Sequence, residues 1–210
     1  TRGHRFHSNG FIKLRRPEQY VSALADAKVV ACFEQRQQII RQQVESQASA
    51  LGATAVIDSE LLDEVTALVE WPVALTGSFE ARFLHVPQEA LISSMKEHQK
   101  YFHVVDAAGK LKPYFITVAN IESSDPQQVI AGNERVIRPR LSDAAFFFDT
   151  DRKIPLVDRV HALGNIVFQQ QLGTLLQKTE RVRNLAAALA PKVGAPVELA
   201  QRAGLLSKAD

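Results

Sequence analysis

Residues 132–151 read GNERVIRPRLSDAAFFFDTD and combine basic, aromatic and acidic residues within one short stretch. It places three arginines, Arg135, Arg138 and Arg140, around an internal proline, Pro139. Because proline lacks an amide hydrogen and crowds the preceding residue, we expect Arg138 to be extended and the stretch to split into two pieces. The arginines would then cluster at the joint, and part of the following phenylalanine triplet would be enclosed by other elements.

Composition limits the class of protein to which this stretch belongs. The chain has 210 residues, of which 46% are hydrophobic, so it can bury a core as one large domain or two modest ones. A formal charge of +2 is too small for bulk polyanion binding, so any nucleic-acid contact must come from local basic clusters. A single cysteine, Cys32, and the short apolar runs favour a cytoplasmic protein without a membrane partner.

The hydrophobic pattern predicts an α+β fold, a mixed sheet with flanking helices followed by a mostly helical region. We divide the chain into a mixed region, 1–153, and a helical region, 154–210. Helices are expected at 17–25, 34–51, 59–70, 88–99, 157–190 and from 197 onward. Strands are expected at 28–33, 55–57, 73–78, 101–106 and 114–120, with a hairpin turn at 107–110.

The N-terminal run TRGHRFHSNGFIKLRR has no acidic residue before Glu18 and is the most basic part of the chain. Arg2 and Arg5 could contact phosphates, while Phe6 and Phe11 either stack on bases or anchor the segment. The alternative is a solvated strand edge with its aromatic side chains turned inward. The two histidines of this run have no carboxylate or cysteine close by in sequence, so we expect no metal site.

A second basic group lies in MKEHQKYFHV, residues 95–104. Lys96 and Lys100 are four residues apart and would share one helical face that could hold a phosphate, or simply form a solvent-facing helix end. Glu97 and His98 are adjacent and diverge on a helix, so they do not form an acid and base pair.

No catalytic template is complete. The chain has neither a nucleophile elbow nor a glycine-rich phosphate loop. Asp149 and Asp151 are expected at a solvated helix end, and Cys32, in VVACF, is expected to be a buried inert thiol. We therefore assign no catalytic residue and no metal ligand.

The whole set of segments resembles one family, the bacterial glycyl-tRNA synthetase β subunit. The unusual strings HQKYF and RLSDAAFFFDTD make the resemblance specific, and the similar segments cover nearly the whole chain in the family's order. These segments are TRGHRFH (1–7), VEWPVALTGSF (69–79), MKEHQKYFHV (95–104), FITVAN (115–120), GNERVIRPRLSDAAFFFDTD (132–151), VFQQQLGTLLQKTERV (167–182) and LSKAD (206–210).

The resemblance implies an internal fragment of a larger β subunit. Its region 1–153 would be similar to the B3/B4 domain of the phenylalanyl-tRNA synthetase β subunit, incomplete at its N-terminus, and 154–210 would lead into a truncated HD-like domain. In this family the enzyme attaches glycine to its tRNA using ATP. The α subunit carries the adenylate chemistry, with ATP and Mg, and the β subunit supplies tRNA recognition within an α2β2 heterotetramer. No cofactor is implied for the fragment itself.

The resemblance does not specify RNA-contacting residues, so we infer them from charge. Three hypotheses remain: a tRNA-binding and scaffolding piece, an editing-type hydrolase by analogy with the B3/B4 domain, and a pure scaffold. In the scaffold, the arginines would pair with carboxylates such as Glu134, Asp143 and Asp149. The inferred RNA contacts are Arg2, Arg5, Lys96, Lys100, Arg135, Arg138 and Arg140.

Overall fold

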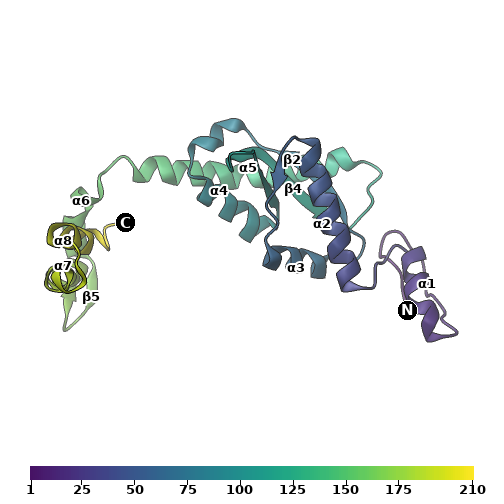
Figure 1. Ribbon diagram of the computed structural model, residues 1–210, viewed down its shortest axis with the longest axis horizontal. Helices are drawn as coiled ribbons and strands as arrows, with labels where there is room; N and C mark the ends of the chain where they lie inside the picture. Colours follow the sequence, from purple (N-terminus) through teal and green to yellow (C-terminus); the bar gives the residue numbers. More distant parts are fainter. The chain divides into compact units, whose positions relative to one another are not determined.

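The computed structural model describes residues 1–210, and the chain divides into two units, 1–146 and 147–210, which are described separately (Figure 1). The first unit is built on a four-stranded antiparallel sheet with the order β1-β3-β4-β2. Its strands are β1 (Thr54–Ala55), β2 (Val73–Ser78), β3 (Phe102–Val105) and β4 (Leu111–Ala119). Its helices are η1 (Pro17–Gln19), α1 (Tyr20–Asp26), α2 (Phe33–Ala50), α3 (Ser59–Leu68), η2 (Ala81–His85), α4 (Gln88–Ser93), η3 (Ser94–His98) and α5 (Pro126–Asp151), the last of which continues beyond residue 146.

The mixed α+β class is confirmed, as are the β3–β4 hairpin and the first four predicted helices, with shifts at their ends. The strand predicted at 28–33 is wrong, because these residues pair with no strand. Lys28 takes a left-handed conformation, φ 60°, which closes α1, and Val30 donates its N–H to the Glu70 carbonyl in the connection after α3. The apolar run therefore packs as an extended connection rather than as a sheet strand.

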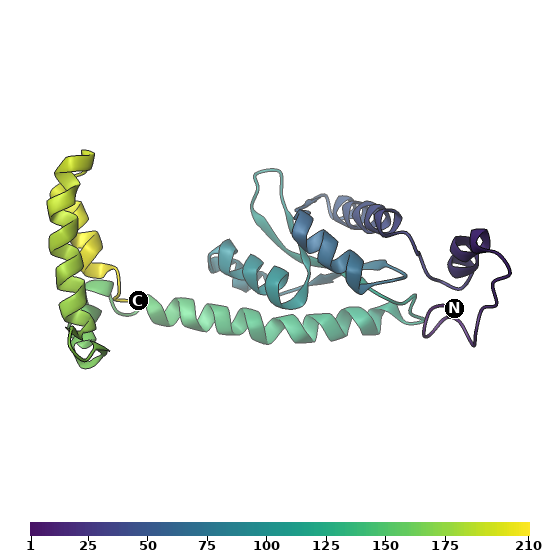
Figure 2. The same cartoon turned by 90° about the horizontal axis from the view of Figure 1, so that it is seen from below.

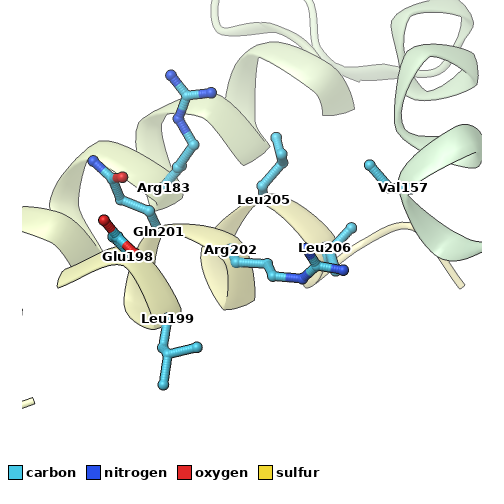
Figure 3. A pocket seen from close by; sticks show the side chains of 8 residues that line it. All are labelled: Val157, Arg183, Glu198, Leu199, Gln201, Arg202, Leu205 and Leu206. Carbon is cyan, nitrogen blue, oxygen red and sulfur yellow. The ribbon is translucent and has the colours of Figure 1, made fainter. Parts of the chain in front are cut away.

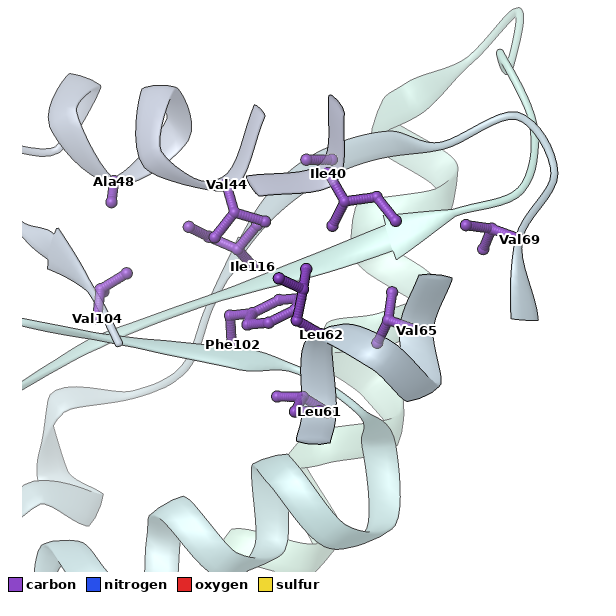
Figure 4. Close-up of a cluster of buried hydrophobic side chains, with 11 residues drawn as sticks. Ile40, Val44, Ala48, Leu61, Leu62, Val65, Val69, Phe102, Val104 and Ile116 are labelled. Carbon is purple, nitrogen blue, oxygen red and sulfur yellow. The ribbon is translucent and has the colours of Figure 1, made fainter. Parts of the chain in front are cut away.

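One face of the sheet is covered by α2 and α3, which enclose the main hydrophobic core (Figure 4). Helix α2 contributes Ile40, Val44 and Ala48, which recur at intervals of four residues and so lie on one face. Helix α3 is capped by Asp58, whose Oδ1 accepts a hydrogen bond from the Leu61 N–H at 3.0 Å. The remaining core side chains are Leu61, Leu62, Val65, Val69, Ala74, Phe102, Val104 and Ile116.

An aromatic layer formed by Tyr101 and Phe115 connects the sheet to α5. The rings of Tyr101 and Phe115 stack with their centroids 4.5 Å apart. A Cβ at Gly77 would lie 2.3 Å from Cζ of Phe115, so the phenylalanine ring lies directly across this glycine. The Tyr101 hydroxyl donates a 2.6 Å hydrogen bond to Asn133 of α5, and burial raises the pKa of Tyr101 to about 12. This layer ties α5 to the sheet.

Helix α5 runs unbroken through Pro139, so the predicted division of this stretch at Arg138 is wrong (Figure 2). The fully buried residues of the helix are Ile137 and Leu141, and Pro139 is exposed. The Arg135 carbonyl, which loses its helical partner at the proline, therefore lies on the open side, where water can bond it. Packing of the buried stripe offsets the cost of about 3 kcal/mol that proline adds inside a helix.

The phenylalanine triplet lies near the end of this helix, which ends at Asp151. Phe146 and Phe147 are 63% and 61% exposed, and only Phe148 is half-buried, with the Arg152 guanidinium 5.2 Å from its ring centroid. Enclosure of the triplet is therefore limited to its last member within this chain.

The second unit contains the helices α6 (Leu156–Arg159), η4 (Val160–Asn165), α7 (Leu175–Leu189), η5 (Ala190–Val193) and α8 (Val197–Leu206). The long helix predicted at 157–190 is wrong in its middle, where β5 (Val167–Gln169) and β6 (Gly173–Thr174) form a hairpin. The signal for this break is a capping box, in which Thr174 and Gln177 begin α7. At Gly204 a Cβ would lie 2.8 Å from the Arg183 Cα, so α7 and α8 approach closely there. No helix of the chain has both the length and the apolar character needed to cross a membrane.

Candidate nucleic-acid interface

The N-terminal loop, residues 1–12, is a closed and ordered segment. Its ends are joined by hydrogen bonds between Thr1 and Ile12 in both directions, and Arg2 and Phe11 form an antiparallel bridge. A Cβ at Gly3 would lie 2.4 Å from the Ala27 Cβ, so the loop presses closely against the end of α1. The compact closure of both ends is typical of an Ω-loop.

Two histidines fasten the N-terminal loop to the residues that follow β4. His4 is fully buried, accepts a hydrogen bond at Nδ1 from the Phe6 N–H and therefore donates from Nε2 to the Asn120 carbonyl, at 2.7 Å. His7 accepts from the Glu122 N–H through Nε2, at 3.0 Å. Both side chains thus hold the loop in place.

Asn120 is the centre of this attachment. Its side-chain oxygen accepts hydrogen bonds from the backbone N–H groups of Glu70 and Trp71, each at 2.9 Å. Beside it, Lys28 forms a 3.0 Å ion pair with Glu122, lies 4.7 Å from the centroid of the Trp71 ring, and lowers the pKa of the Glu122 carboxyl. Sequence reasoning missed Asn120, because its three bonding partners are brought together only by the fold.

The aromatic residues of the loop point outward rather than inward. Phe6 is 69% and Phe11 is 73% exposed, so the predicted alternative with inward-turned aromatics is wrong. The Arg5 guanidinium lies 5.5 Å from the Phe6 ring centroid, and the Arg2 guanidinium lies 4.4 Å from the Phe11 centroid. Both arginines are exposed, and neither forms an ion pair with a carboxylate.

The three arginines of α5 do not form one cluster. Successive helical residues turn by about 100°, which places Arg138 and Arg140 on opposite flanks of the buried stripe and Arg135 on the outer face. Arg138 pairs with Glu80 at 3.0 Å, whereas Arg135 and Arg140 are exposed and have no carboxylate partner. The joint expected at Pro139 is absent, so the clustering that depended on it is wrong as well.

Lys96 and Lys100 both lie against α3. Lys96, in the single π-helical turn η3, pairs with Asp58 at 3.0 Å, and this pairing raises the pKa of the lysine. The pKa of the Asp58 carboxyl is lowered mainly by the hydrogen bond from the Leu61 N–H and next by the bond from Lys96. Lys100 follows the helix with φ 59° and pairs with Glu64 at 2.8 Å. The two lysines therefore do not share a helical face, and both have carboxylate partners within the fold.

The other polar residues considered in the sequence give no catalytic arrangement. Cys32 is half-buried rather than buried, and its thiol donates to Glu34 at 3.2 Å. A backbone hydrogen bond, and after it this thiol hydrogen bond, lower the pKa of the Glu34 carboxyl. Glu134, expected as a possible arginine partner, instead accepts hydrogen bonds from the Ser78 N–H and hydroxyl, both at 2.8 Å.

The second unit has a hollow of about 620 Å³ beside α8 (Figure 3). Arg183 and Leu199 point in opposite directions there, and Arg183 pairs with Glu180 at 3.2 Å. The hollow is lined by Val157, Arg183, Glu198, Leu199, Gln201, Arg202, Leu205 and Leu206. This set provides no nucleophile paired with a base, so the hollow gives no support to a hydrolytic site.

Comparison with known proteins identifies the family. The family model described as glycyl-tRNA synthetase beta subunit matches residues 1–210. The glycine–tRNA ligase beta subunits of Hahella chejuensis, Chromohalobacter salexigens and Acinetobacter baylyi are 62%, 58% and 56% identical to the chain. Each match covers 100% of this chain and 30% of the relative, so the chain spans less than a third of their length. The chain therefore belongs to the glycyl-tRNA synthetase β-subunit family.

Proposed function

We propose that this chain is the part of the β subunit that contributes tRNA-backbone contacts and a structural framework to glycyl-tRNA synthetase, and that it takes no part in adenylate formation. The observation that carries the proposal is the division of the seven cationic candidates into two groups. Arg2, Arg5, Arg135 and Arg140 are exposed and have no carboxylate partner. Lys96, Lys100 and Arg138 are each within 3.0 Å of a carboxylate.

The unpaired arginines are the better phosphate ligands. A guanidinium without a carboxylate partner has no competing anion to release, and it can bond two phosphate oxygens at once. The paired cations would have to break an existing ion pair first, so we assign Lys96, Lys100 and Arg138 to holding α3, η3, η2 and α5 together.

The remaining assignments follow from the family. We propose that the subunit acts in the cytoplasm with an α subunit, as an α2β2 assembly, on glycine tRNA. ATP and Mg would be used by the α subunit in attaching glycine. We also propose the likeness of the first unit to a B3/B4 domain and of the second to the start of an HD-like domain.

Salt-dependent binding of glycine tRNA by the assembled enzyme tests the proposal. Replacing Arg135 and Arg140 with glutamine should weaken binding and reduce the slope of log K against log salt by about 0.7–0.9 for each phosphate that is no longer neutralised. Arg138→Gln is the matched control, because it removes the same charge from the same helix at a position already paired with Glu80. An equal weakening of binding in the control and in the double variant would contradict the proposal.

A further inference from the structure

The N-terminal loop presents two aromatic rings to solvent on a support that is otherwise tightly held. The two exposed rings are those of Phe6 and Phe11, while the buried His4 holds the loop from inside. The loop backbone lies so close to Ala27 at Gly3 that there is no room for a side chain there. Two exposed phenylalanines on an ordered loop forgo the stabilisation that burial of each ring would give, which points to a ligand.

The arrangement of each ring with its arginine indicates the chemistry of that ligand. One face of Phe6 is beneath Arg5 and one face of Phe11 is beneath Arg2, and the high exposure of both rings leaves area open for a flat partner. An aromatic ring next to a guanidinium suits a nucleotide, whose base can stack on the ring while its phosphate bonds the arginine.

The charge of the loop selects an anionic partner. Besides Arg2 and Arg5, the following residues Lys13, Arg15 and Arg16 are exposed, and no acidic residue occurs before Glu18. A neutral protein surface would cover the rings but leave these cations unpaired, whereas the phosphates and bases of a nucleic acid engage both the cations and the rings.

We infer that the N-terminal loop binds unpaired nucleotides of RNA, with Phe6 and Phe11 each stacking one base and the neighbouring arginines bonding the phosphates. The inference rests on the proposed function and narrows it from the tRNA backbone in general to a single-stranded segment or loop. Bases in a duplex are stacked on one another and do not present a free face, whereas unpaired bases do.

Competition binding on the assembled enzyme tests the inference, with labelled glycine tRNA displaced by a short unstructured single-stranded RNA or by the same strand in a duplex. The single strand should compete better than the duplex. Phe6→Leu and Phe11→Leu should each weaken tRNA binding by about fivefold or more at every salt concentration, with the salt slope unchanged, since a stacking contact releases no counterion.

Phe33→Leu is the matched control, because Phe33 is also partly exposed and lies 5.7 Å from the guanidinium of Arg36, but is in α2. It should leave tRNA affinity unchanged. In the 210-residue chain alone, whose single tryptophan is Trp71, the fluorescence should match wild type in all variants, because the Trp71 N–H bonds Asn120, the residue to which the loop is attached.

The outcomes separate the two proposals. If the phenylalanine variants bind like wild type while Arg2→Gln and Arg5→Gln weaken binding and flatten the salt slope, backbone binding stands and the stacking inference is overturned. If none of the four loop variants changes binding, the loop is not an RNA contact, and both the stacking inference and the assignment of Arg2 and Arg5 to the RNA backbone are overturned. Equal competition by single strand and duplex would also overturn the inference.

Discussion

Gly77→Ala probes the packing between the sheet and its aromatic layer. The added Cβ would lie 2.3 Å from Cζ of Phe115, whereas carbon atoms in contact are about 3.5–4.0 Å apart. Phe115 is fully buried and its ring is stacked on Tyr101, so it cannot retreat without disturbing a second side chain. Overpacking of this kind costs about 1–3 kcal/mol, and the gain of up to about 1 kcal/mol from replacing a glycine offsets only part of it.

We therefore expect Gly77→Ala to lower the free energy of unfolding by about 2 kcal/mol. The assay is urea unfolding followed by the fluorescence of Trp71, which lies in the first unit and reports on it alone. With a urea dependence of about 1–3 kcal/mol per molar, the midpoint should fall by roughly 1 M.

Gly132→Ala provides the control for this experiment. Gly132 lies in α5 with nothing within 4 Å of an added Cβ, so alanine there should stabilise the unit by about 0.5–1 kcal/mol. The double variant Gly77→Ala with Phe115→Leu should lose less unfolding free energy than the sum of the losses in the two single variants. A neutral or stabilising Gly77→Ala would refute the placement of the Phe115 ring across the glycine.

Three further predictions concern stability. Asn120→Ala should cost about 2–4 kcal/mol in urea unfolding, because it leaves the N–H groups of Glu70 and Trp71 without their acceptor; a change below about 0.5 kcal/mol would mean that water replaces it. Burial, with a smaller contribution from Lys96, lowers the pKa of His103 in the folded chain. The unfolded chain therefore takes up the proton at a higher pH than the folded chain, and the free energy of unfolding should fall as pH drops below about 6.5. His103→Gln should reduce this pH dependence. Burial raises the pKa of Tyr101 to about 12, so stability should fall by up to about 3 kcal/mol as pH rises from about 10 to 12, and an equally steep fall in Tyr101→Phe would exclude this cause.

The hairpin and the helices of the first unit were predictable because their signals are local. The runs 101–106 and 114–120 are rich in aromatic and β-branched residues and are separated by a predicted turn at 107–110, which is typical of a hairpin. Ser59 lies at the start of a strongly amphipathic segment, which predicts a helix. The helix start itself was displaced by one residue, since Asp58 rather than Ser59 accepts the capping bond.

The failures occurred where tertiary packing overrides a local signal. Pro139 predicted a break, but buried contacts at Ile137 and Leu141 hold α5 together while the proline remains on the open side. The run 28–33 has the composition of a strand, yet it pairs with neither of the strands at the edges of the sheet, β1 and β2. Neither outcome is encoded in neighbouring residues alone.

The candidate interface was predictable in composition but not in pairing. The basic character of residues 1–16 is evident from the sequence, whereas Arg138 differs from Arg135 only because Glu80, far away along the chain, lies beside it. Sequence also could not decide whether Phe6 and Phe11 point inward, since the burial of His4 in their place depends on the distant Asn120.

The salt dependence of glycine tRNA binding by the assembled enzyme distinguishes cations that bind RNA phosphates from cations that are paired within the fold, using two sets of charge changes. Glutamine at Arg2, Arg5, Arg135 and Arg140 should weaken binding and reduce the salt slope by roughly 2.8–3.6 if each arginine neutralises one phosphate. Glutamine at Lys96, Lys100 and Arg138 should leave the slope unchanged, because these cations are already paired. A folded enzyme in which the first set changes neither affinity nor slope, or in which both sets change them equally, would contradict the assignment of the unpaired arginines to RNA phosphates.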